Sequence, residues 1–556
     1  MILSLITNAQ NERYSIVINE ILADPSPVVG LPNSEYIELR NASKQPINLL
    51  KWKIDNGSTI ATITSSYILN PDSVVVLCSK TQALFFKDQS KIIGLTSFPS
   101  LNNEGDIITL TAADGKTIHS VEYNISWFNN PVKSNGGWSL EMIDPFKPCD
   151  KNNWSGSIHP SGGSPGKENS IFKKSSASDN IEALQCIALN KNQLLLKLNQ
   201  GADSSSLSDP KNYTLGDSRY QPISASAIGP LFKTAVLNFS TSLEENKIYT
   251  LKALSILHCK STQKDSLEIR TGLTKLADNG DLIINEILFD PPAYGADFIE
   301  LRNNSLSVIN AKEIFLSNKN SSGLVGTAYA SSETDFNIFP GEYFVVTTDS
   351  NFLYKSWTNA NKNQLTEIKY MPSYPDNEGV VLLLNKQGKI IDELSYSDEM
   401  HFPLLRDKSG VSLERINPYS TSKSQSNWHS ASSSSGYGTP TLINSQFNKI
   451  DTSNNTINIQ PAYFSPNNDG QNDVLSIEYN FESPGNMISI FAFDQNGMLI
   501  QKIADNLLCG IGGAFVWDGF DSKRQRTPPG IYIILSETLD MRGKRMRFKK
   551  AVGLGL

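Results

Sequence analysis

One sequence module occurs twice in this chain of 556 residues, and this repetition constrains the fold more than any other feature. Residues 17–25 read VINEILADP, and residues 283–291 read IINEILFDP. Further matches follow in register: EYIELRN at 35–41 with DFIELRN at 297–303, NEG at 103–105 with 377–379, SLE at 139–141 with 412–414, NW at 153–154 with 427–428, and G-[ST]-P at 163–165 with 438–440. We expect a residue present in both copies to serve the fold, and a catalytic candidate present in one copy alone to be accidental.

The length of the chain predicts several domains. A prior of roughly 150 residues per domain gives about four, and the repeat is itself of that size, so it is a whole domain and not a solenoid unit. The predicted organisation is a signal-peptide remnant and tail at 1–13, the first copy at 14–170, a smaller β spacer domain at 181–273, the second copy at 280–447, and a fourth β domain at 457–556.

Strand patterns dominate throughout the chain. Residues 35–40 alternate with period two, and residues 106–111 and 117–123 form a strand pair around the turn ADGK at 113–116. The second copy repeats the pair around NKQG at 385–388. Many short strands separated by Gly, Pro and Asn turns predict an all-β protein of four tandem β-sandwich, immunoglobulin-like domains.

Composition excludes several classes of function. The net charge is −7 and the chain has no long basic run, so nucleic acid is not expected as a partner. No stretch reaches the ~20 apolar residues of a spanning helix, so the body of the protein is not expected to cross a membrane.

Residues 1–9 end in small residues after a short apolar run, as the end of a secretory signal does. We therefore expect an exported protein.

The cysteines predict disulfides rather than metal or redox motifs, because none forms a CxxC pair. Thr347 replaces Cys78 in the second copy. Ser422 likewise lies near the position of Cys149, so both cysteines are lost together, which favours a Cys78–Cys149 bridge. All five cysteines are Cys78, Cys149, Cys186, Cys259 and Cys509.

A second bridge is predicted between Cys186 and Cys259, which fall on the first and a late strand of the spacer domain. Export would permit both bonds. The alternative is that the cysteines are small buried apolar residues.

No catalytic set stands out. Residues 162–166 satisfy G-x-S-x-G around Ser164, but they lie in a Gly/Ser/Pro loop and the second copy has no serine there. Glu20 and Glu38 recur in the second copy together with Arg40, which predicts a cross-strand ion pair rather than a catalytic carboxylate pair. The five histidines show no metal-ligand spacing, so we expect no catalytic residues and no resident cofactor.

One loop of the fourth domain could hold Ca²⁺. Asn467, Asp469, Asn472 and Asp473 supply oxygen atoms around a glycine, and Ca²⁺ takes six to eight oxygen ligands. The loop has only two carboxylates and lacks EF-hand spacing, and Asx residues equally stabilise turns. A weak Ca²⁺ site and a plain turn both remain open.

The repeated motifs resemble those of the lamin tail domain, an immunoglobulin-like β-sandwich. The family implies secreted multidomain surface proteins in bacteria and carries no catalytic residues. The fourth domain, with YFSPNNDGQND at 463–473, FDQNG at 493–497 and PGIY at 529–532, resembles the gliding-motility-associated C-terminal domain of Bacteroidetes-type bacteria. That resemblance implies an address to the type IX secretion system, although residues 549–556 depart from the closing pattern of a sorting signal.

These observations predict a non-enzymatic, exported scaffold or adhesin at the cell surface or outer membrane. Its partners would be other surface or outer-membrane proteins, including components of type IX secretion or gliding. One alternative is a carbohydrate-binding protein that uses Trp127, Trp138 and Trp357 as platforms for glycans. Another is an accessory subunit that holds an enzyme or an outer-membrane barrel in trans.

Overall fold

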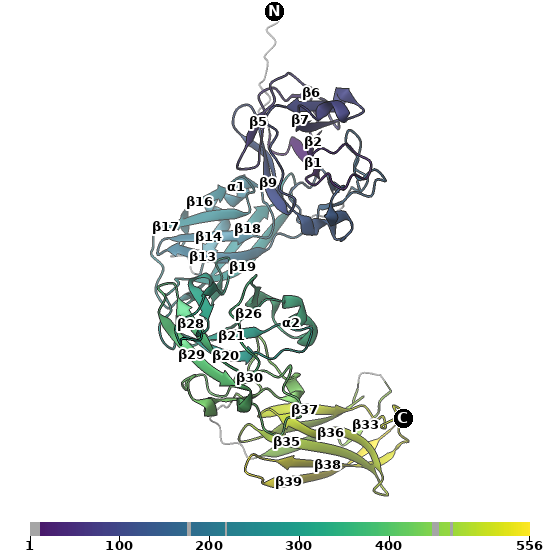
Figure 1. The fold of residues 1–556 in the computed structure, drawn as a ribbon, viewed down its shortest axis with the longest axis vertical. Helices are drawn as coiled ribbons and strands as arrows, with labels where there is room; N and C mark the ends of the chain where they lie inside the picture. The colour runs from purple at the N-terminus through teal and green to yellow at the C-terminus, as the bar shows by residue number, and fades with distance from the viewer. Residues whose placement is uncertain (1–11, 175–178, 217–219, 448–454, 468–470, 556) are drawn as a thin grey trace, which may run out of the picture. The chain divides into compact units, whose positions relative to one another are not determined.

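The computed structural model describes residues 12–174, 179–216, 220–447, 455–467 and 471–555 (Figure 1). The chain divides into two compact units, residues 1–244 with 248–273 and residues 245–247 with 274–556. Strands dominate both units, and among the described residues the α-helices are the short α1 (Ser204–Leu207) and α2 (Ser350–Ser356). Four large hydrophobic cores match the four predicted sandwiches. The all-β fold class is therefore confirmed, while the exact domain boundaries stay predictions.

The first copy of the repeat folds as two sheets that share one core. The larger sheet has the order β12-β11-β1-β2-β7-β8, and the smaller has the order β10-β9-β4-β5. Their strands are β1 Ile16–Leu22, β2 Tyr36–Asn41, β4 Lys53–Asp55, β5 Ile60–Thr62, β7 Val74–Ser79, β8 Ile92–Leu95, β9 Gly105–Thr111, β10 Thr117–Asn124, β11 Leu140–Met142 and β12 Trp154–Gly156, with a small pair β3 Ile47–Asn48 and β6 Ile68–Leu69.

A bulge in β1 determines which of its side chains face the main core. The pairing with β2 shifts between Ile18 and Glu20, so Asn19 is the extra residue. Ile18 and Ile21 consequently both face the main core, although strict alternation would put them on opposite sides. Glu20 is left on the other face of the sheet, beside a smaller cluster that includes Tyr36.

The spacer domain completes the first unit. It pairs the sheet β13-β14-β17-β16 with the sheet β15-β18-β19 around its own core. The strands are β13 Ala183–Asn190, β14 Gln193–Leu198, β15 Tyr213–Leu215, β16 Pro222–Ile228, β17 Thr234–Phe239, β18 Ile248–Leu257 and β19 Lys264–Gly272.

The second copy reproduces the first in order and register. Its larger sheet is β27-β26-β21-β20-β30-β31 and its smaller sheet is β24-β23-β28-β29. The bulge recurs between Ile284 and Glu286. The strands are β20 Leu282–Leu288, β21 Phe298–Asn303, β23 Ile314–Ser317, β24 Tyr329–Ala330, β26 Tyr343–Thr347, β27 Leu365–Glu367, β28 Glu378–Asn385, β29 Ile390–Ser397, β30 Leu413–Arg415 and β31 Trp428–Ser430, with a small pair β22 Ile309–Asn310 and β25 Asn337–Ile338.

The C-terminal domain packs a three-stranded sheet, β32-β34-β37, with a five-stranded sheet, β33-β39-β38-β35-β36. The strands are β32 Thr456–Gln460, β33 Tyr463–Phe464, β34 Leu475–Asn480, β35 Asn486–Asp494, β36 Leu499–Cys509, β37 Gly512–Trp517, β38 Gly530–Leu539 and β39 Arg545–Leu554. Within the part of the chain that the structure describes, no helix has the length and apolar character needed to cross a bilayer.

Candidate functional site: buried carboxylates, a closing loop and the cavity beside them

Three carboxyl groups lie together on the face of the first module's larger sheet that is turned away from the main core. Glu20 on β1 is opposite Glu38 on β2 and opposite Glu141 on β11 in the strand register. All three residues are fully buried. The sequence motifs contain each of them, but Glu141 was not foreseen as a partner of the other two; its recurrence in both SLE motifs was the available signal.

The carboxylates hold the segment that closes the module, residues 163–171, here named the closing loop. The backbone N–H of Ser164 donates to Glu20 Oε1 at 2.8 Å, and the N–H of Gly166 donates to Glu38 Oε2 at 2.7 Å. Glu141 accepts from Ser164 Oγ at 2.9 Å and from the N–H of Ile171 at 3.1 Å. The closing loop has no strand partner, so the three carboxyl groups accept hydrogen bonds from its N–H and O–H donors.

The second module repeats this arrangement with residues 438–446 as its closing loop. The N–H of Thr439 donates to Glu286 Oε1 at 2.9 Å, and Thr439 Oγ1 donates to Glu414 Oε1 at 2.8 Å. The N–H of Thr441 donates to Glu300 Oε2. Because the same bonds occur in both copies, the recurring glutamates serve the fold.

Burial changes the acidity of these groups. Desolvation, reinforced by the neighbouring carboxylate of Glu141, raises the pKa of Glu20 to about 7. The same causes raise the pKa of Glu286 to about 8, with Glu414 as the neighbour. Desolvation followed by the charge of the adjacent glutamate raises the pKa of Glu38 and of Glu300 well above the ordinary value. A shared proton within each cluster relieves the repulsion between the acids.

The predicted ion pair between these glutamates and Arg40 is wrong. The guanidinium of Arg40 lies 3.7 Å from Asp72 and 4.0 Å from Glu168 instead. The physical reason is the closing loop, whose N–H and O–H donors occupy the carboxylates of Glu20 and Glu38 and leave no room for a cation.

Ser164 lies in the closing loop, not at a strand-to-helix turn, and its hydroxyl is buried against Glu141. The nearby His159 contacts Ser161 Oγ through Nδ1 at 2.7 Å. The G-x-S-x-G pattern is thus explained by the needs of the loop: Gly163 has no space for a side chain, since a Cβ there would lie 2.6 Å from the Tyr36 hydroxyl.

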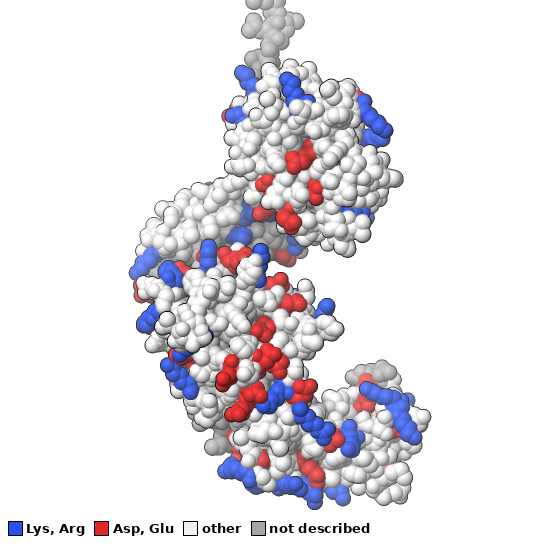
Figure 2. Space-filling model, viewed as in Figure 1, with Lys and Arg blue, Asp and Glu red and all other residues white. Residues whose placement is uncertain are grey.

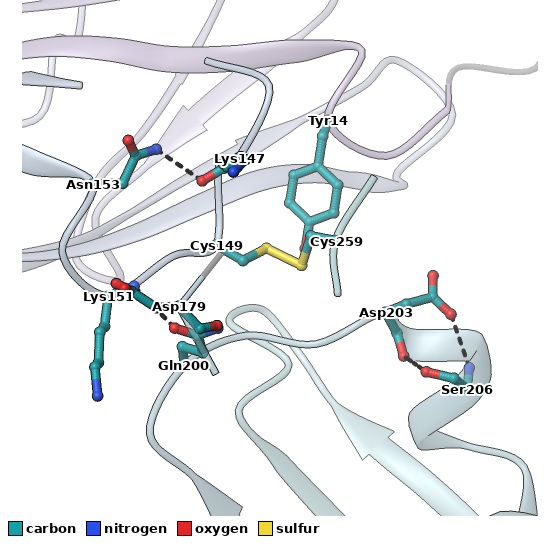
Figure 3. The surroundings of a disulfide bond; sticks show 10 residues. All are labelled: Tyr14, Lys147, Cys149, Lys151, Asn153, Asp179, Gln200, Asp203, Ser206 and Cys259. Atoms are coloured by element: carbon teal, nitrogen blue, oxygen red, sulfur yellow. Dashed lines mark hydrogen bonds between the residues drawn. A yellow bond between two sulfur atoms is a disulfide. The ribbon is translucent and has the colours of Figure 1, made fainter. Parts of the chain in front are cut away.

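The disulfide of the described chain joins Cys149 to Cys259 (Figure 3). Both predicted pairings, Cys78–Cys149 and Cys186–Cys259, are therefore wrong. Cys78 is a free, buried residue in the small cluster around Tyr36, and Cys186 is buried within the spacer core without a bond to Cys259. Their packing as small apolar side chains matches the alternative interpretation, and burial raises the pKa of the Cys78 thiol to about 11.

The bond ties the first module to the spacer domain. Cys149 lies in the loop after β11, and Cys259 follows β18. Hydrogen bonds cross the same junction: Gln200 of the spacer accepts from the N–H of Lys151 at 3.1 Å, and Lys260 Nζ donates to the carbonyl of Ala42 at 2.9 Å. Sequence reasoning placed each bridge inside one domain, whereas the cysteines connect two.

At the position of His119, the second module has a pair of charged side chains. In the first module the N–H of Ile18 donates to His119 Nδ1 at 2.9 Å. In the second, the N–H of Ile284 donates to Asp392 Oδ2 at 2.8 Å, and Arg415 pairs with Asp392 at 3.2 Å. Desolvation by burial lowers the pKa of His119 to about 4, so this imidazole is neutral where its counterpart is an anion.

The predicted Ca²⁺ loop is only partly described. Asp469 lies outside the described residues, and Asn472 has a φ of 53° and accepts a bond from the N–H of Ser465 at 2.9 Å. Among the described residues, no cluster of three or more His, Cys, Asp or Glu side chains could hold a metal ion. The site formed by Asn467, Asp469, Asn472 and Asp473 stays a prediction.

The tryptophans proposed as glycan platforms are each half-buried. Trp127 packs on Trp154 with ring centroids 5.9 Å apart, and Lys133 Nζ lies 4.9 Å from the ring centroid of Trp138. Trp357 stands edge-on to Phe298 at 5.7 Å. A role of these rings as glycan platforms stays a prediction.

A cavity of about 890 Å³ opens beside the first closing loop. One wall is formed by the closing loop and the other by the turn after β7, where the short 3₁₀ helix η1 (Ala83–Phe85) lies. The sequence did not predict this site, because its residues come from three loops, of which only the closing loop recurs in the second copy. Nothing in the local pattern of those loops indicates a cavity.

The last strand of the chain carries basic residues at a sheet edge. Arg545, Arg547 and Lys549 are exposed on β39, which β33 covers only at Gly553 and Leu554. Figure 2 shows blue side chains along this rim of the C-terminal domain, where Figure 1 places β39.

Comparison with solved structures gives matches of low identity and low TM-score. A chain of FlgD from P. aeruginosa is 22% identical, with coverage of 15% of this chain and 62% of that one and a TM-score of 0.13. The N-terminal part of the bacterial S-layer protein SbsC is 12% identical over 39% of this chain and 43% of that one, with a TM-score of 0.16. This chain thus spans less than two thirds of either.

PorZ, a surface component of the type IX secretion system of Porphyromonas gingivalis, is 10% identical over 98% of this chain and 100% of that one, with a TM-score of 0.17. TM-scores this low carry no argument about function. No curated protein matches the chain. The family model of the lamin tail domain, however, matches residues 9–124 and 276–398, which are the opening two thirds or more of each repeated module.

Proposed function

We propose that this chain is a non-enzymatic, exported surface protein that acts by binding other proteins, as a scaffold or an adhesin. The disulfide between Cys149 and Cys259 is the observation that carries the proposal, because such bonds persist in oxidising compartments outside the cytoplasm. It links the first module covalently to the spacer domain, and a protein of the reducing cytosol would not keep such a bond.

The shared polar residues support the non-enzymatic part of the proposal. Glu20 and Glu38 recur in the second module as Glu286 and Glu300, and all four are engaged with closing-loop donors. Groups that are buried and bonded in this way hold a loop and do not face a substrate. A hydrolase activity of the purified chain that disappears with one substitution would overturn this part.

A link to type IX secretion or gliding is the finer proposal, and it is supported by the motifs of the C-terminal domain. Affinity purification of the tagged chain from gently solubilised outer membranes of its native host, followed by mass spectrometry, tests it. A stoichiometric secretion component or surface protein is expected. Recovery of the chain without any partner would contradict the scaffold role.

Export is tested on the same material. Mass mapping of peptides under non-reducing conditions should find Cys149 linked to Cys259 in chain recovered from the cell surface. Chain held in the cytoplasm by removal of residues 1–13 serves as the control and should be reduced. A free thiol at both positions in the surface fraction would contradict the proposal.

A further inference from the structure

We propose that the cavity of the first module binds a large aromatic side chain of a partner polypeptide, together with acidic residues that flank that side chain. The inference rests on the proposed binding role and names the partner chemistry for one site.

The cavity has an apolar floor that is open to solvent. Leu31, Phe85, Ile92 and Pro165 contribute to its lining. Phe85 is 65% exposed, although burying a Phe side chain is worth roughly 1.5–3 kcal/mol. An exposed ring inside a concave apolar site of this volume has the character of a ligand pocket.

The second module indicates what fits at this position. There the turn after β26 forms α2, and the ring of Trp357 covers the closing loop so closely that a Cβ at Gly438 would lie 2.6 Å from its Cζ2 atom. Trp357 also packs edge-on against Phe298. The natural occupant of this place in the repeat is therefore an indole ring carried on a polypeptide.

The first module fills this place with smaller side chains. Phe86 takes the edge-on position against Tyr36 at 5.8 Å, as Trp357 does against Phe298. The atoms nearest to a Cβ at Gly163, the counterpart of Gly438, belong to Tyr36, Glu20 and Leu31. A phenyl ring and a leucine thus stand where the second copy has an indole, and a cavity of about 890 Å³ stays open beside them.

The rim of the cavity selects for negative charge. Lys87, Lys91 and Lys167 line it against the single carboxylate of Asp88. Among the described residues, no carboxylate lies within ion-pair distance of Lys87 or Lys167, and both are exposed. Lys91 donates to the carbonyl of Gly166 at 2.5 Å, which holds it at the closing loop. Acidic side chains next to the aromatic anchor would pair with the two free lysines.

Peptide display against the purified full-length chain tests the proposal. A library of random peptides is selected on the wild-type chain and counter-selected on a Gln82→Trp variant, in which a new indole on the cavity wall fills the space. We expect enriched sequences with one Trp, Tyr or Phe next to Asp or Glu. Enrichment of sequences without this pattern, or of sequences that the Gln82→Trp variant binds equally, would overturn the proposal.

Two matched pairs of variants then assign the contacts by fluorescence anisotropy of an enriched peptide. Phe85→Ser should weaken binding about tenfold or more, whereas Leu84→Ser should not, because Leu84 is 80% exposed on the same turn but does not line the cavity. Lys87→Ser with Lys167→Ser should weaken binding about five- to twentyfold and reduce its salt dependence, while Lys116→Ser should change neither.

Gln82 is half-buried at the cavity wall and the other substituted positions are exposed, so each variant should keep the thermal unfolding midpoint of the wild type, which shows that it folds. Vesicles that contain anionic lipid and an acidic polysaccharide are tested as alternative ligands. If either binds in a way that depends on the lysines but not on Phe85, the ligand is a polyanion other than a polypeptide and the proposal is overturned. Export and membrane recovery of the chain do not depend on this outcome, so its failure is distinguishable from failure of the proposed function.

Discussion

At the scale of single residues, this protein keeps acids in its interior without cations. Glu20, Glu38 and Glu141 are satisfied by hydroxyl and N–H donors, and the same solution appears in the second module. A carboxyl group that keeps its proton costs far less to bury than a carboxylate. The repeated glutamates therefore hold the closing loops in place and also make the stability of the modules depend on pH.

The stability of both modules should fall as the pH rises. The folded-state pKa values of Glu20 (about 7) and Glu286 (about 8) lie above the unfolded value of 4.5. Their contribution is thus fully present below about pH 4.5 and is lost as the pH rises through about 7 to 8, at a cost on the order of 3 kcal/mol for Glu20 and 5 kcal/mol for Glu286. Calorimetry between about pH 5 and pH 8.5 should show both module transitions moving to lower temperature as the pH rises.

The variant Glu20→Gln mimics the protonated acid and should flatten the pH dependence of the first module only. Glu168→Gln is the matched control, because Glu168 is exposed and should leave the slope unchanged. A first-module transition that keeps the wild-type slope in Glu20→Gln would assign the pH dependence to other groups.

Replacement of Arg415 should destabilise the second module, because it leaves the half-buried Asp392 without its cation. Arg415→Met is expected to cost on the order of 1–3 kcal/mol. The first module has Met142 and His119 at the two corresponding positions, so Asp392→His combined with Arg415→Met should recover part of the loss. A double-mutant cycle measured by denaturant unfolding checks this, and additive effects of the two substitutions would contradict the coupling.

At the scale of elements, the strand β39 lies at a sheet edge that is open along most of its length. It pairs with β38 along its length, while β33 covers only its end. Arg545, Arg547 and Lys549 stand exposed along the remainder, and Arg547 pairs with Glu537 across the strand pair at 2.5 Å. Charges on an edge strand oppose its pairing with another chain.

Neutralising this edge should make the protein associate. The triple variant Arg545→Thr, Arg547→Thr and Lys549→Thr keeps β-forming residues but removes the repulsion, so we expect dimers and larger species in sedimentation velocity runs. A control that removes three exposed charges from turns, Lys116→Thr, Lys523→Thr and Lys544→Thr, should stay at the wild-type sedimentation coefficient. Equal association of both variants would attribute the effect to net charge instead of the edge.

The sequence predicted the elements well, because strand pairing and burial follow local patterns. The alternation at residues 35–40 and the turns at 113–116 and 385–388 appear as expected. The function of Glu20 and Glu38 was harder to predict, because their partners are closing-loop atoms 128 to 144 residues away. The cavity was not predictable, since it depends on how the turn after β7 packs and not on its composition.

At the scale of the whole chain, the disulfide pairing shows where reasoning from repeats fails. The joint absence of Cys78 and Cys149 from the second copy suggested a bond within the module. Disulfide formation requires Cα atoms within about 7 Å, and only the packing of the first module on the spacer brings Cys149 that close to Cys259. Contacts between domains leave no periodic trace in either domain's sequence.

Loss of this bond should loosen the first unit. The disulfide closes a loop with a sequence separation of 110, for which the chain-entropy account gives about 4–5 kcal/mol. Cys149→Ser with Cys259→Ser is expected to split a joint calorimetric transition of the first module and spacer into two. Cys78→Ala, which removes a free thiol, serves as the control. A double variant that unfolds as the wild type does would contradict the bracing role.

The same bond also determines how the chain carries mechanical load. When a force pulls on both ends of the protein, tension enters at the first module and passes from Cys149 directly to Cys259 through the sulfur atoms. The intervening chain, which includes the strands from β13 to β18, is bypassed and bears no tension while the bond is intact. Reduction would return this whole segment to the line of force, so the oxidised protein is shorter and stiffer under tension than the reduced one.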